Sequence, residues 1–218
     1  MREMPLSPDP AIEHRQLNPW IHMWLHPRIT IQQVIDTDPT RLVILIAMIT
    51  GISESLNRAG LRDYGDGLSI SAIVGLAVFL GPIGGIIRLY LFGFLIRWTG
   101  TWLRGEADGE EIRAAYAWSS VPIVWSLCLW IPQIFTFGEE LFTSETPMID
   151  ADPFLSYQLI GFGLVEFVVG VWSFFIFLHA LGQVQGFSAW KALLNLVLAA
   201  LVVLVPLGLI FGSFWFVS

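Results

Sequence analysis

The chain has 218 residues, of which 55% are apolar and only 13% are charged, and its formal net charge is −7. Soluble domains carry about 25% charged residues, so a soluble core of this length would leave too much apolar surface uncovered. The acidic balance also argues against nucleic-acid binding, because that function needs a basic face.

Three long stretches contain no aspartate, glutamate, lysine, arginine or histidine: residues 67–87, 114–138 and 192–218. Each is at least 21 residues long, and a helix needs about 20 apolar residues to cross the hydrocarbon layer. The apolar runs are continuous rather than alternating, so they predict helices and not the strands of a membrane barrel. The sequence therefore predicts an all-α integral membrane protein.

Residues 1–16 are polar and rich in proline, and we expect them to form a disordered cytoplasmic tail. Residues 39–218 form the predicted membrane domain. Its five spans are expected at about residues 40–57, 68–98, 116–136, 154–180 and 189–216. The first span has the shortest charge-free part, only residues 42–53.

Residues 17–38, between the tail and the membrane domain, are predicted to form an amphipathic segment. Asn18 can cap a helix that begins at Pro19, and Pro27 can open a second short helix. Trp20 and Trp24 fall on one helix face, and tryptophan favours the headgroup layer, so an interfacial helix fits. The alternative is two short helices that pack on the protein's own base.

The second span is too long for one upright helix and contains a helix break at Gly81, Pro82, Gly84 and Gly85. The stretch forms either one long kinked helix or two shorter passes. We favour the kinked helix, because the residues after the break supply no loop. The spacing of Gly81 and Gly85 suits close helix packing, within the chain or between copies.

The distribution of lysine and arginine over the loops predicts the orientation of the chain in the membrane. With five spans and a cytoplasmic N-terminus, eight cations lie inside and only Arg58 and Arg62 lie outside, while Arg88 stays within the membrane. The C-terminus is then outside.

Several segments have a recognisable order: Asn-Pro-Trp and His-Pro-Arg-Ile-Thr-Ile within 18–31, Ala-Tyr-Ala-Trp-Ser-Ser-Val-Pro at 115–122, and Gly-Gln-Val-Gln-Gly-Phe-Ser-Ala-Trp-Lys-Ala at 182–192. Together they resemble the Yip1 domain family in its short prokaryotic form. The resemblance implies five membrane helices and a cytoplasmic N-terminus. Eukaryotic members are associated with small GTPases, vesicle trafficking and membrane shaping. This chain lacks their long N-terminal extension, which puts a GTPase partner in doubt and favours a prokaryotic plasma membrane.

Arg88 and Glu166 are the only acidic or basic residues well inside the predicted spans. Such charges are costly in lipid and are usually paired or line a wet cavity. They predict a candidate intramembrane pair, either as part of an ion or proton path or as a structural contact. Unpaired side chains that reach toward the interface are the third possibility.

Catalytic and nucleotide-binding motifs are absent from the sequence, so we expect no enzyme activity and no cofactor. His22 and His26 are one turn apart, but no acidic or cysteine ligand accompanies them, so we expect no metal. The leading hypothesis is a non-enzymatic protein that organises or scaffolds membrane components. Its expected partners are the lipid bilayer and either further copies or other membrane proteins. The alternative is a small transporter or channel that uses Arg88 and Glu166.

Overall fold

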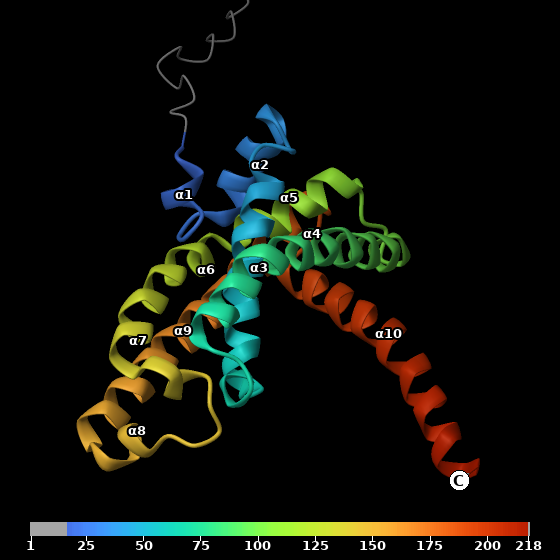
Figure 1. Ribbon diagram of the computed structural model, residues 1–218. Helices are drawn as coiled ribbons and strands as arrows, with labels where there is room; N and C mark the ends of the chain where they lie inside the picture. Colours follow the sequence, from blue (N-terminus) through green and yellow to red (C-terminus); the bar gives the residue numbers. More distant parts are fainter. Residues whose placement is uncertain (1–16, 218) are drawn as a thin grey trace, which may run out of the picture.

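A computed structural model describes the backbone of residues 17–217 and the side chains of residues 17–209. Every regular element in this range is helical (Figure 1). The α-helices are α1 (Pro19–His22), α2 (Pro27–Thr37), α3 (Val43–Leu61), α4 (Ile70–Trp102), α5 (Gly109–Ser119), α6 (Val121–Ser126), α7 (Trp130–Phe137), α8 (Pro147–Ala151), α9 (Pro153–Val184) and α10 (Ala189–Val217). Short 3-10 turns are η1 (Tyr64–Asp66), η2 (Leu127–Leu129) and η3 (Gly138–Leu141). The tail predicted at residues 1–16 lies outside the described residues.

Within the described residues, four helical stretches are long and apolar enough to cross a membrane: Ile70–Trp102, Gly109–Leu141, Pro153–Val184 and Ala189–Leu209. α3, predicted as the first of five spans, is not among them. Its second half contains Glu54 and Arg58, which dilute its apolar character. The all-α fold with several candidate spans is confirmed, whereas the five-span count is not.

Short-range sequence signals determine where several helices begin. The side chain of Asn18 accepts a hydrogen bond from the Trp20 amide at the start of α1. Asp108 forms a capping box with Glu111 at the start of α5. Asp152 caps α9 just before Pro153. These caps satisfy backbone N–H groups that have no partner inside the helix.

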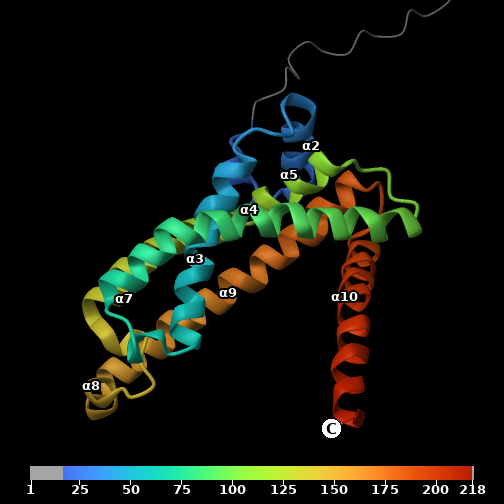
Figure 2. The same cartoon turned by 45° about the vertical axis from the view of Figure 1, so that its right-hand side comes forward.

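α4 is one uninterrupted helix that contains Pro82, so the stretch from 70 to 102 is not two passes. It crosses α3 at a contact between backbones (Figure 2). A methyl group on Gly85 would collide with the carbonyl oxygen of Ala47, and one on Gly81 would lie 2.8 Å from the Ile52 Cα. The glycines of the predicted break therefore allow close packing within the chain. Gly84 points elsewhere, and a methyl group there would meet no atom within 4 Å.

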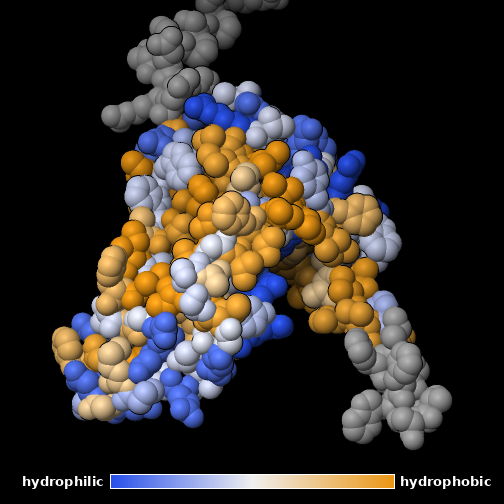
Figure 3. Space-filling view, in the orientation of Figure 1, coloured by the Kyte–Doolittle hydropathy of each residue, from blue (hydrophilic) through white to orange (hydrophobic). Residues whose placement is uncertain are grey.

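α9 and α10 are joined by a tight turn in which Gly186 has a φ of +71°. They pack only near this turn, where Ala192, Asn195 and Ala199 of α10 are buried at helical spacing. Figures 1 and 2 both show α10 diverging from the other helices beyond this region. Figure 3 shows apolar residues over the middle of the visible face and over the described part of α10, with polar residues gathered toward the two ends of the other helices.

Candidate functional site

Three segments that are distant in the sequence meet at the end of the molecule that carries α1, α2 and α5 (Figure 1). We call residues 18–31, 115–122 and 182–192 together the motif cluster. The rings of Trp20 and Trp118 pack edge to face with their centroids 5.5 Å apart. Arg28 donates to the Gln183 side chain at 3.4 Å, which in turn donates to Gln32 at 3.0 Å. The segments that carry the family resemblance therefore form one site.

The two predicted interfacial anchors, Trp20 and Trp24, are only partly exposed. Both pack against a buried cluster that includes Met23 and Trp118, and the Trp24 carbonyl accepts a hydrogen bond from the Trp172 indole at 3.1 Å. This is the packing expected if residues 17–38 cover the protein's own base. The tryptophans hold this segment to the protein.

A different set of side chains on the same segment faces outward. Ile21, Leu25 and Ile29 recur at a spacing of four residues and are 63–73% exposed. They lie on α1, in the turn after it and on α2, and exposed apolar side chains suit the boundary between lipid and water. The interfacial position of residues 17–38 stays a prediction, and these three residues are its best candidates for lipid contact.

Arg88 does not meet Glu166. Its guanidinium forms an ion pair with the carboxylate of Glu54 on α3, and Arg58 lies 3.6 Å from the same carboxylate. The Tyr116 ring lies 6.0 Å from the Arg88 guanidinium carbon. The predicted pairing was wrong because α4 crosses α3 and brings Arg88 to Glu54 in the second half of that helix.

Glu166 accepts a hydrogen bond from the Gln133 amide at 2.7 Å. Gln133 lies on α7 and is only 4% exposed. Gln133 was not predicted as a site residue, although an amide in a long apolar stretch is a usable signal. Arg88 and Glu166 therefore belong to two separate local contacts and not to one candidate pair.

A second buried amide joins α4 to α10. Thr99 donates to the side-chain oxygen of Asn195 at 2.6 Å, and the Asn195 amide donates to the Ile96 carbonyl at 3.2 Å. Both polar side chains are fully buried. This contact fixes the first turns of α10 to α4 and was also missed from the sequence. The signal was again a lone amide within an apolar run.

The described residues contain no group of three or more histidine, cysteine, aspartate or glutamate side chains that could hold a metal. The His22 ring lies 3.1 Å from the Asn18 carbonyl oxygen within its own helix. The polar groups of the motif cluster are mainly indoles and amides, with Arg28 and Lys191 as its two cations.

Comparison with known proteins gives one match. A family model for the Yip1 domain matches residues 21–210, which is most of the chain and includes nearly all of the motif cluster. No curated protein matches the chain, and no solved structure does. The matched range and the apolar helices together show that the chain is a multi-pass membrane protein that belongs to the Yip1 domain family.

Proposed function

We propose that this protein has no enzyme activity and organises membrane components by assembling laterally with further copies of itself. The observation that supports this most directly is the divergence of α10 from the rest of the bundle (Figures 1 and 2). Divergence leaves an open side between α9 and α10 within the apolar part of the molecule. A helix from another chain can enter from that side.

The exposed residues define this open side. No residue of α9 before Ser173 is buried, and no described residue of α10 after Ala199 is buried. Phe167 of α9 continues the helix face of the packed Leu178 and is 68% exposed, and Val203 of α10 continues the face of the buried Ala199 and is 38% exposed. Gly163 and Gly170 lie on one face of α9 with open space around them, which permits a helix to approach closely.

A second copy is the occupant that these surfaces favour. α10 beyond Ala199 and the side of α9 that it leaves are parts of the same fold, and neither is covered by the side chains described for residues 17–209. If two copies exchange α10, each α10 covers the exposed side of α9 in the other copy. The two chains are then related by a two-fold axis. Association in lipid then depends on close packing rather than on the hydrophobic effect.

The membrane orientation belongs to the same proposal. The motif cluster and its surroundings contain Arg28, Arg41, Arg113 and Lys191, whereas Arg58 and Arg62 lie at the opposite end of α3. This distribution supports a cytoplasmic N-terminus. α10 runs away from that end (Figure 1), which supports a C-terminus outside. We place the protein in a prokaryotic plasma membrane.

The transport alternative depended on Arg88 and Glu166 acting together. Arg88 is instead neutralised by Glu54, and Glu166 is bonded to Gln133. The two residues therefore do not act on one shared path, and the transport alternative loses the joint site on which it rested. Organisation through lateral assembly is therefore the function that the geometry supports best.

Disulfide crosslinking in membranes tests the proposal. In a Cys128→Ser background, we expect a copy with Phe167→Cys and a differently tagged copy with Val203→Cys to form a disulfide-linked dimer under mild oxidation. The reason is that α10 of one copy lies along α9 of the other. The dimer is measured on a non-reducing gel with both tags.

Phe135→Cys is the matched control, because Phe135 is 86% exposed on α7, and both views place α7 on the far side of the molecule from α10 (Figures 1 and 2). Paired with Val203→Cys, it should give little dimer. Equal crosslinking at Phe135 and Phe167, or no crosslinking at either, would contradict lateral assembly through this side.

A further inference from the structure

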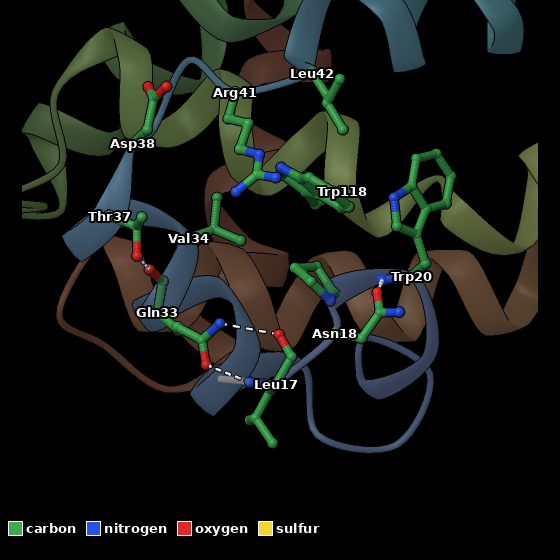
Figure 4. Close-up of a pocket in the computed structure, with 11 residues that line it drawn as sticks. Leu17, Asn18, Trp20, Gln33, Val34, Thr37, Asp38, Arg41, Leu42 and Trp118 are labelled. Carbon is green, nitrogen blue, oxygen red and sulfur yellow. Dashed lines mark hydrogen bonds between the residues drawn. The ribbon is translucent and has the colours of Figure 1, made fainter. Parts of the chain in front are cut away.

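A cavity of about 410 Å³ lies at the edge of the motif cluster, between α1, α2, the residues just before α3 and Trp118 of α5 (Figure 4). Trp20 and Trp118 form an aromatic wall, and Arg41 and Leu42 line the side toward α3. The cavity therefore joins the polar end of the molecule to the start of an apolar helix.

The polar groups on the α2 side of the cavity are already bonded to each other. The Gln33 side chain both accepts from and donates to the Leu17 backbone at 2.9 Å. The Thr37 hydroxyl donates to the Gln33 carbonyl at 2.7 Å, and the Asn18 side-chain oxygen accepts from Trp20. These bonds fix the walls and leave few acceptors free to face a ligand.

Two strong donors remain. The indole nitrogen of Trp118 is buried without any hydrogen-bond partner, and the residue is only 2% exposed. Arg41 forms no ion pair within residues 17–217, and Figure 4 shows its guanidinium directed toward the Trp118 ring. A buried donor without a partner is uncommon and points to a missing acceptor. The two donors together fit an anion.

Asp38 also lines the cavity and reduces its positive charge. Hydrogen bonds from the Thr40 hydroxyl and amide lower the pKa of the Asp38 carboxyl, with Arg41 contributing less. These bonds hold the carboxylate on Thr40, and Figure 4 shows it pointing away from Trp118. The anion-facing side is therefore formed by Arg41 and Trp118.

We propose that this cavity binds a phosphate group. Arg41 is the last charged residue before the apolar stretch 42–53, and Ile44 and Leu45 in the first turn of α3 are each 47% exposed. A phospholipid places its phosphate at just such a boundary, with its acyl chains along the exposed apolar residues. The favoured source is therefore a lipid headgroup, and free phosphate is the other source of the same chemistry.

Native mass spectrometry of the full chain in detergent micelles tests the site. Phosphatidylglycerol is titrated, and diacylglycerol with the same acyl chains serves as the phosphate-free probe. We expect phosphatidylglycerol to bind and diacylglycerol not to bind. Arg41→Gln and Trp118→Phe should each weaken phosphatidylglycerol binding by about tenfold, because each removes a donor to a charged acceptor. Arg41 is exposed, so its variant is expected to fold normally.

The matched controls are Arg104→Gln and Trp125→Phe, which change an exposed arginine and an exposed tryptophan outside the cavity. Both should bind phosphatidylglycerol as the unmodified chain does. Competition by inorganic phosphate would assign the site to free phosphate, and failure to compete would assign it to the lipid headgroup. Undiminished binding by both cavity variants, or equal binding of diacylglycerol, would overturn the proposal.

Discussion

Glu54→Gln is expected to destabilise the protein by about 3 kcal/mol, more than Arg88→Met does. Removing one member of a buried ion pair costs about 3–5 kcal/mol, and the partial exposure of Arg88 and Glu54 lowers the expectation toward the bottom of that range. Glu54→Gln leaves both Arg88 and Arg58 without an acidic partner, and arginine cannot lose its charge. Arg88→Met leaves Glu54 with Arg58, so its cost is smaller, about 1–2 kcal/mol.

Unfolding in mixed micelles measures both changes and supplies a double-mutant cycle. Arg88→Met and Glu54→Gln should couple by more than about 1 kcal/mol. Glu166→Gln is the control: combined with Arg88→Met, it should be additive within about 0.5 kcal/mol, since Glu166 contacts Gln133 instead. Strong coupling between Arg88 and Glu166 would show that the pairing described here is wrong.

Gly85→Ala is expected to cost about 2–3 kcal/mol, because the added methyl group meets the backbone carbonyl of Ala47 and cannot be relieved by a side-chain rotation. The two helices would have to separate at their crossing. This separation would also weaken the neighbouring contact between Arg88 and Glu54. The same micelle unfolding experiment measures the loss.

Gly84→Ala is a control one residue away in the same helix. Its methyl group meets no atom within 4 Å, so the gain in helix propensity should leave stability unchanged or raise it by up to about 1 kcal/mol. If Gly84→Ala and Gly85→Ala have equal effects, close packing of α3 on α4 does not determine stability at this crossing.

The sequence by itself determined the helical class and most of the helix positions. A helix in lipid must satisfy its own backbone, so a long charge-free stretch predicts one without reference to any other part of the chain. This is why the spans expected at 154–180 and 189–216 correspond to α9 and α10. Local caps such as Asp152 act over a few residues and are visible in the sequence for the same reason.

Only the tertiary structure decided which of these elements meet. The crossing of α3 and α4 depends on the close approach at Gly81 and Gly85, and that crossing gives Arg88 its partner Glu54. The docking of Trp20 on Trp118 and the divergence of α10 depend likewise on surfaces that lie far apart in the chain. Periodicity and charge patterns describe a helix one turn at a time, whereas crossing angles follow from side-chain packing between helices.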